Sequence, residues 1–109
     1  MNWSISYLDE ALKDLKKLSK ERQILAIKAI NRVKENPLPN SEGGYGQPLG
    51  NYSGNNLTGL YKIKLRGEGI RIVYKMIRIE QHIIIIVIGL REDNEVYDIA
   101  SKRRKKYSL

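Results

Sequence analysis

The chain has 109 residues, enough for one domain with a single modest core, so we expect residues 1–109 to form one domain. Its 20 lysines and arginines outweigh 12 aspartates and glutamates, and the formal net charge of +8 favours a polyanionic partner: nucleic acid first, an anionic membrane surface second, an acidic protein third. Without cysteine, disulfides and thiolate catalysis are excluded, and without a signal-peptide pattern or a bilayer-length apolar run we expect a soluble, cytoplasmic protein that has no membrane partner.

One short strand and two helices are predicted in the first third of the chain. Residues 3–8 alternate apolar side chains with serines, which is typical of a strand. Residues 8–18 carry leucines and an alanine at helical spacing, with acidic residues in the first turn. Ser19 fits the N-cap of a second helix, which the segment NPLP ends. We expect a helical hairpin with a shared apolar side and a lysine-rich outer face.

A long loop is expected next, since residues 40–59 are rich in Gly, Asn and Ser and offer almost nothing to bury. After a hairpin over residues 60–77, the segment HIIIIVIGL is apolar on both faces and predicts a strand that is partly buried on both sides. The last predicted helix has apolar residues at helical spacing, with Asp93 or Asn94 as its cap. The order of elements predicts an α+β domain: a small antiparallel sheet, an N-terminal helical hairpin on one face and a C-terminal helix.

The hairpin has two faces of opposite character. Because side chains alternate along a strand, Lys62, Lys64 and Arg66 share one face, and Arg71 and Lys75 join them from the second strand. The turn is expected in GEG. Pairing Arg66 with Arg71 places both apolar sets on one face of the hairpin, whereas a slip of one residue would turn Arg71 toward the core. We therefore expect the first register, which also places Lys62 opposite Lys75. Facing cations destabilise a sheet, so this face, expected to be left open, predicts an anionic ligand.

Most familiar catalytic sets are absent from the sequence. The glycine-rich segment GGYGQPLG lacks the residues of a phosphate-binding loop, and no serine has an evident histidine–acid arrangement. The single histidine, His82, is expected to be an edge or partly buried imidazole. We therefore expect no metal and no cofactor. A basic and phenolic set remains, for which the simplest interpretation is a solvated strand face and an isolated tyrosine. The alternative is RNA cleavage by the RNA's own 2′-hydroxyl, in which cations stabilise the phosphate dianion. Lys and Tyr have ordinary pKa values near 10, about 3 units above neutrality, so such a set gains most when something else aligns the RNA backbone.

The segments GLYKIKLRGEGIRIVYKMI and IVIGLREDNEVYDIASKR closely resemble the RelE group of the RelE/ParE toxin–antitoxin superfamily, and the resemblance covers nearly the whole chain. Its specific motif is K-x-K-x-R with a downstream arginine before VY, then G-x-R, then E-V-Y. The resemblance implies a type II toxin that cleaves mRNA in the ribosomal A site without a metal and so inhibits translation. It also implies silencing by a RelB-like antitoxin, through which alone the toxin would reach operator DNA.

Carried over by motif, the resemblance implies roles for five residues. Lys62 and Lys64 would stabilise the phosphate and assist activation of the 2′-hydroxyl. Arg71 would stabilise the transition state, and Arg91 would act as general acid or stabilise the leaving group. Tyr97 would stack on or orient the scissile nucleotide, or serve as the base.

The chain departs from its relatives before the hairpin, where its loop is longer and where PLGN replaces a leucine followed by a basic residue. The resemblance therefore implies that one phosphate contact is lost or has moved to Lys75, Arg66 or the tail. The tail is either a solvated helix end or a grip on ribosomal RNA, and its basic residues are Lys102, Arg103, Arg104, Lys105 and Lys106. Two other functions stay open: a ParE-like toxin of DNA gyrase, against which the intact residue set argues, and a non-catalytic module that binds nucleic acid or an antitoxin.

Overall fold

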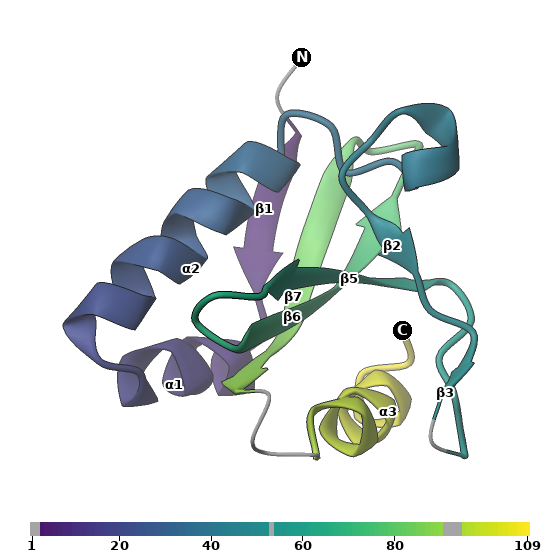
Figure 1. Cartoon of the computed structure of the whole chain (residues 1–109). Coiled ribbons are helices and arrows are strands. Elements are labelled where there is room, and N and C mark those ends of the chain that lie inside the picture. Colours follow the sequence, from purple (N-terminus) through teal and green to yellow (C-terminus); the bar gives the residue numbers. More distant parts are fainter. Residues whose placement is uncertain (1–2, 53, 91–94) are drawn as a thin grey trace.

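The structure is a computed structural model that describes residues 3–52, 54–90 and 95–109 (Figure 1). Its main elements are β1 (Ser4–Tyr7), α1 (Asp9–Lys17), α2 (Lys20–Val33), β5 (Leu60–Leu65), β6 (Ile70–Ile77), β7 (His82–Leu90) and α3 (Val96–Lys106). Between α2 and β5 lie a 3-10 turn, η1 (Asn40–Glu42), and three two-residue strands, β2 (Gln47–Pro48), β3 (Asn51–Tyr52) and β4 (Asn55–Asn56). The expected α+β class is confirmed. Over the described ranges no helix is long and apolar enough to cross a bilayer.

The main sheet has five strands in the order β1-β7-β6-β5-β2 and is mixed rather than wholly antiparallel. Strand β1 runs parallel to β7, from the pair Ser4↔His82 to the pair Tyr7↔Ile85, and the other neighbours are antiparallel. A parallel pair needs a long connection between its strands, and the whole helical hairpin lies between these two. Strands β3 and β4 pair only with each other.

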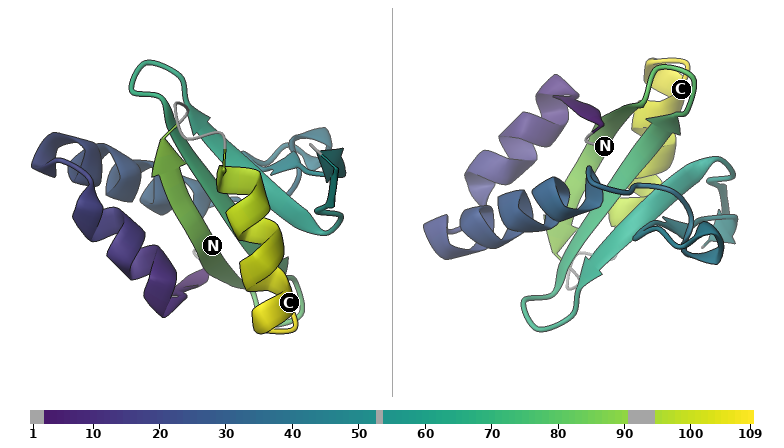
Figure 2. Two further views of the ribbon diagram at one scale, coloured as in Figure 1. Left: turned by 90° about the horizontal axis from the view of Figure 1, so that it is seen from below. Right: turned by 90° about the horizontal axis from the view of Figure 1, so that it is seen from above.

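Helices cover both faces of the sheet, and Figure 2 shows α1 and α2 on one side and α3 on the other. The first core, under α1 and α2, includes Ile72 and Ile85, while the second, under α3, includes Val73 and Val87. This explains why β7 is apolar on both faces. The expectation that the basic face would be left open is wrong in part, because α3 packs over the half of it nearest β7.

The segment expected as a bare loop contributes to the second core. Leu49 is 5% exposed and Leu57 is fully buried, so residues 40–59 do bury side chains, contrary to expectation. Two isolated leucines among many polar residues have no periodicity, and pattern analysis therefore gives no sign of their burial.

The register of the β5–β6 hairpin differs from the expected one by two residues. Lys64, not Arg66, lies opposite Arg71, and Lys62 lies opposite Val73. The expected register would have placed Ile70 in the turn, whereas the structure pairs it with Leu65 and buries it completely. A shift of two keeps every side chain on its face, so the predicted division into an apolar and a basic face is confirmed.

The ends of the helices follow the sequence signals in part. Ser19 caps α2 as expected, and its hydroxyl accepts a hydrogen bond from the Arg22 N–H at 3.2 Å. Asp93 and Asn94, expected to cap the last helix, lie outside the described residues. The cap position of α3 is Glu95, whose side chain makes no capping hydrogen bond.

A partly buried ion pair connects the two helical layers. The Arg103 guanidinium donates to the Asp14 carboxylate twice, at 2.6 Å and 3.2 Å, and to the Ile86 carbonyl at 3.0 Å. The same carboxylate accepts the Ile88 N–H at 3.1 Å, on a stretch of β7 that lies beyond the end of β1. The side chains are 16% and 14% exposed. This pair therefore ties α3 to α1 and to the sheet at one point.

Candidate active site on the basic hairpin

The β5–β6 hairpin brings three cations together on one face of the sheet. Lys62 and Lys64 point from β5 to the same side, and Arg71 lies opposite Lys64 on β6. All three side chains are partly buried. The three residues sit on backbone that is hydrogen-bonded in a sheet, so the positions of their Cα atoms are fixed relative to one another.

Lys62 has the most perturbed environment of the three. Burial lowers the pKa of its ammonium below 10.5, and the neighbouring charges of Lys64 and Arg71 lower it further. Its Nζ also lies 5.9 Å from the ring centroid of Tyr97. Lys62 thus gives up its proton more readily than an ordinary lysine does, and it does so beside two further cations, Lys64 and Arg71.

Tyr97 reaches Lys62 because α3 packs very close to the sheet. A Cβ atom at Gly89 would lie only 2.5 Å from Cγ2 of Val96, the first residue of α3. Gly89 is also the β7 partner of Arg71, so the helix begins directly beside the cations. A further hydrogen bond of 2.6 Å, from the Asn55 amide to the Asp98 carboxylate, holds the first turn of α3 to the β4 strand.

Four of the five residues expected to be catalytic are therefore brought together: Lys62, Lys64, Arg71 and Tyr97. Arg91, the fifth, lies outside the described residues. Gly89 was not among the residues expected from the sequence, although a glycine inside an apolar strand often marks a close approach of backbone. The Asp14–Arg103 pair was not expected either, because the two residues are 89 positions apart and a single sequence gives no signal for such a contact.

The residues expected to bind RNA or the ribosome are scattered. Arg66 is exposed in the hairpin turn, and the Lys75 ammonium donates to the backbone oxygen of Leu109. In the tail, Arg103 is held inside the fold by Asp14, so we leave it out of any RNA-binding set. Lys106 pairs with Glu10 at 2.9 Å on the surface. The remaining tail residues, for which RNA binding stays a prediction, are Lys102, Arg104 and Lys105.

His82 lies between two serines of β1, as a partly buried residue near the sheet edge. Its Nδ1 is 2.6 Å from the Ser4 hydroxyl and its Nε2 is 2.8 Å from the Ser6 hydroxyl. Both ring nitrogens are thus used to join β1 to β7. Across the described part of the chain, no three His, Cys, Asp or Glu side chains gather as a metal site would require.

Sequence comparison places this chain among bacterial toxins. The model of a family described as the ParE toxin of the type II toxin–antitoxin system parDE matches residues 5–95. A RelE-like toxin protein of Escherichia coli is 31% identical over 109 residues, covering 96% of this chain and all of that protein. The mRNA interferase toxin RelE of Escherichia coli is 32% identical over 103 residues, covering 94% of this chain and 98% of the relative.

Comparison with solved structures gives the same relatives. The isolated RelE toxin of Escherichia coli superimposes with a TM-score of 0.67 at 30% identity, covering 93% of this chain and 97% of that one. The toxin of the intact RelBE toxin–antitoxin complex of Escherichia coli gives a TM-score of 0.61 at 27% identity, with 81% and 95% covered. The fold and the order of its elements are therefore those of these toxins.

Proposed function

Because this chain belongs to the RelE/ParE superfamily of type II toxins, as a RelE-like member, we propose that it is a ribosome-dependent endoribonuclease that cleaves mRNA in the A site and so inhibits translation. We further propose that a RelB-like antitoxin neutralises it, as the complex of its Escherichia coli relative suggests. Any contact with operator DNA would then be made through the antitoxin. The observation that carries the proposal is the cluster of Lys62, Lys64, Arg71 and Tyr97.

The proposed reaction is attack by the ribose 2′-hydroxyl on the adjacent phosphate. The lowered pKa of Lys62 makes it the member of the cluster best suited to accept the hydroxyl proton. Lys64 and Arg71 would stabilise the charge that develops on the phosphate, and Tyr97 would stack on or orient the nucleotide. Arg91 is proposed, on the family motif alone, to protonate or stabilise the 5′ leaving oxygen.

The cluster explains why a ribosome would be required. Lysine and tyrosine side chains are weak bases at neutral pH because their ordinary pKa values lie near 10. Free RNA is flexible and would seldom hold its 2′-hydroxyl in line with the phosphate, so this weak set of groups gains most from an aligned substrate. Correct orientation alone can contribute several kcal/mol to a reaction. A decoding site that holds the codon in one conformation would supply that contribution.

The test uses purified protein, ribosomes programmed with a defined mRNA and an empty A site. Mapping of 5′ ends by primer extension should show cleavage inside the A-site codon, and naked mRNA should stay intact. Arg71→Ala should abolish cleavage. Arg78→Ala is the matched control, because Arg78 is an exposed arginine after the same strand that pairs with Glu42, away from the cluster.

The identity of the attacking nucleophile can be tested on the same ribosomes. Attack by the 2′-hydroxyl predicts that a message with a single 2′-deoxynucleotide at the scissile position is not cut. Cleavage of that message would refute the proposed nucleophile. An intact normal message would refute the nuclease proposal, and a gyrase supercoiling assay would then separate a ParE-like toxin from a module that only binds.

A further inference from the structure

Lys62 has the properties of a nucleophile as well as those of a base. An amine attacks a carbonyl carbon only in its uncharged form, and a lysine reaches that form more readily when burial or neighbouring cations lower its pKa. Both causes act on Lys62, first burial and then the charges of Lys64 and Arg71. An amine of this kind reacts with an aldehyde or a ketone and forms a Schiff base.

The Tyr97 ring indicates where a nucleotide would meet this amine. The Nζ atom of Lys62 lies 5.9 Å from the ring centroid, and the close approach of Val96 to Gly89 holds this end of α3 on the sheet. Aromatic side chains on a basic surface stack with the bases of single-stranded nucleic acid. Where a strand lacks a base, the ring can fill the gap itself. The C1′ carbon that carried the base then lies beside the ring, within reach of the Lys62 amine.

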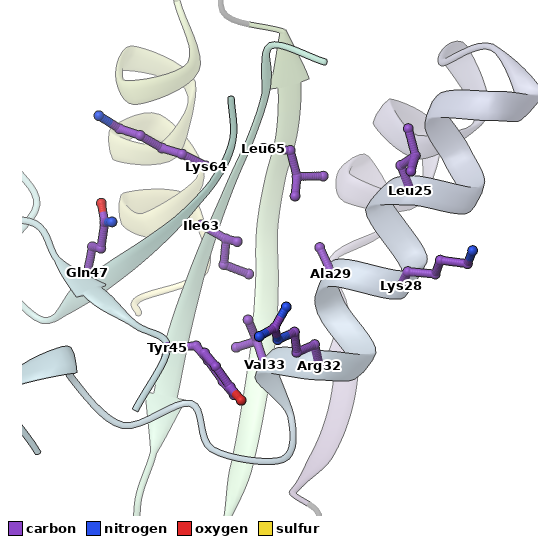
Figure 3. Close-up of a pocket in the computed structure, with 10 residues that line it drawn as sticks. All are labelled: Leu25, Lys28, Ala29, Arg32, Val33, Tyr45, Gln47, Ile63, Lys64 and Leu65. Carbon is purple, nitrogen blue, oxygen red and sulfur yellow. The ribbon is translucent and has the colours of Figure 1, made fainter. Parts of the chain in front are cut away.

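The two cations beside Lys62 are placed to hold a phosphate of such a strand. Lys62 and Lys64 are two residues apart on one face of β5, so their Cα atoms are about 7 Å apart, and Arg71 lies opposite Lys64. In Figure 3 the Lys64 side chain points away from α2 and from the hollow between α2 and β5. Cations of this kind bind backbone phosphates whatever the base sequence. A phosphate held by Lys64 and Arg71 therefore brings the neighbouring sugar toward Lys62.

We propose that Lys62 attacks the aldehyde of an abasic site in single-stranded DNA, and that the Schiff base so formed cuts the strand at this site. An abasic site is a sugar that has lost its base, and its open form carries an aldehyde at C1′. It offers an electrophile to the amine, a gap to the aromatic ring and phosphates to the cations. This activity uses the same cluster as the proposed mRNA cleavage but requires neither that function nor a ribosome.

The steps of this reaction balance without an oxidant or a reductant. The uncharged Nζ adds to C1′, and loss of one water leaves a protonated imine between Lys62 and the sugar. The positive charge makes the C2′ hydrogens acidic, and a water molecule takes one of them as a proton. The electron pair of that C–H bond forms the C2′–C3′ double bond while the C3′–O bond breaks. The phosphate leaves as the 5′ end of the downstream fragment, and Lys64 and Arg71 stabilise its charge. Hydrolysis of the imine returns the amine and leaves an unsaturated aldehyde on the upstream fragment.

The first test traps the Schiff base with sodium borohydride, which reduces it to a stable amine. The full chain is mixed with a single-stranded DNA that contains one abasic site, and borohydride is then added. We expect a covalent adduct of protein and DNA, and digestion followed by mass spectrometry should place it on Lys62. The absence of an adduct would overturn the proposal, and so would adducts spread over many lysines, which would show unspecific reaction.

Two substrates test the chemistry of cleavage. Without borohydride the abasic strand should be cut at the abasic site, although DNA has no 2′-hydroxyl and is therefore no substrate of the proposed ribonuclease. A strand with tetrahydrofuran in place of the abasic sugar has the same gap but no aldehyde, so it should compete for binding and stay uncut. Cleavage of the tetrahydrofuran strand would refute a Schiff base.

Variants separate the nucleophile from the ring. Lys62→Arg keeps a cation but removes the amine, since a guanidinium stays protonated, so adduct and cleavage should both be lost. Lys28→Arg is the matched control, because Lys28 lies on α2, on the other face of the sheet (Figure 3), and it should react as the unaltered chain does. Tyr97→Ala should slow trapping about fivefold or more, whereas Tyr97→Phe, which keeps the ring, should not. Equal trapping of a folded Lys62→Arg protein would refute the nucleophile, and equal trapping of Tyr97→Ala would refute the role of the ring.

The pH profile provides an independent readout. Because only the uncharged amine reacts, the trapping rate should reach half of its maximum below pH 10.5, and a higher midpoint would indicate an ordinary lysine. The outcome is also distinct from that of the ribosome assay. If the chain is trapped on Lys62 but inactive on ribosomes, the proposed mRNA cleavage fails and this inference stands. Normal mRNA cleavage without trapping would refute this inference alone.

Discussion

Replacing Arg103 with methionine should destabilise the whole domain, although the residue looks like one more cation in a basic tail. Its guanidinium forms a fork with the Asp14 carboxylate, and the two side chains are 16% and 14% exposed. Methionine keeps much of the aliphatic length and removes the charge. The partly buried Asp14 carboxylate would then keep the Ile88 N–H as its one remaining hydrogen-bond partner among the described residues.

The magnitude follows from burial. Breaking a buried ion pair from one side costs about 3–5 kcal/mol, and the residual exposure of this pair favours the lower end, about 3 kcal/mol. An unfolding entropy of about 2.1 cal/mol/K per residue gives about 0.23 kcal/mol/K for 109 residues. The melting temperature should therefore fall by about 13 °C.

A surface pair with the same fork geometry is the matched control. Arg78 donates to Glu42 at 3.0 Å and 2.6 Å, but these side chains are 52% and 45% exposed. Exposed pairs contribute about 0–1 kcal/mol, so Arg78→Met should lower the melting temperature by less than about 4 °C. Both variants are compared by calorimetry or by circular dichroism.

A second substitution tests the cause. Asp14→Asn removes the buried charge and keeps an oxygen for the Ile88 N–H, so adding it to Arg103→Met should recover much of the lost stability. If Arg103→Met melts no lower than Arg78→Met, or if the double variant is less stable than Arg103→Met alone, burial of an uncompensated charge is not the cause.

Three further predictions concern the packing of α3 and the pH dependence of stability. Gly89→Ala forces α3 away from the sheet, because the new Cβ meets Val96 at 2.5 Å; we expect a loss of about 1–3 kcal/mol in urea unfolding and weaker cleavage, and unchanged values would contradict this. Hydrogen bonds from the Tyr107 hydroxyl and then from Lys106 lower the pKa of Glu10 to about 2. Glu10 therefore stabilises the fold above pH 4.5 and loses this contribution as the pH falls toward 2. Tyr107→Phe should raise the pKa of Glu10 in an NMR titration, and an unchanged pKa would refute this assignment. The folded-state pKa of Lys62 lies below 10.5, so unfolding binds a proton and stability rises as pH rises toward 10.5; Lys62→Gln should flatten this rise, seen in urea midpoints at alkaline pH.

The division of the hairpin into two faces followed from alternation alone, because a strand has a period of two whatever its register. Alternation did not determine the register, since two registers that differ by two residues place the same side chains on the same face of the hairpin. Burial of Ile70 decided between them, and a four-residue turn of the same length, placed one position earlier at Arg66–Gly69, allowed it. The predicted cation cluster survived because it depended on the faces and not on the register.

The sequence pattern does not predict where α3 packs on the sheet. Its helical spacing was visible, but its cover over the basic face depends on contacts between distant residues, such as Val96 with Gly89 and Arg103 with Asp14. The sequence also does not predict that β2 stops pairing with β5 before Lys64, because this depends on the Tyr45 N–H donating to the Asn36 carbonyl and not on any property of β5. Local sequence thus specifies the elements, while long-range contacts decide how they assemble.

The parallel pairing of β1 with β7 has a consequence for synthesis. Ser4 pairs with His82, 78 residues later, and the Asp14–Arg103 pair spans 89 residues, so these contacts cannot form before His82 and Arg103 have been translated. Such distant contacts also make folding slow. The helix that carries Tyr97 follows every strand of the main sheet along the chain, and the proposed active site is therefore completed only after those strands have been made. We therefore expect a nascent chain to lack the complete proposed active site until α3 has packed onto the sheet.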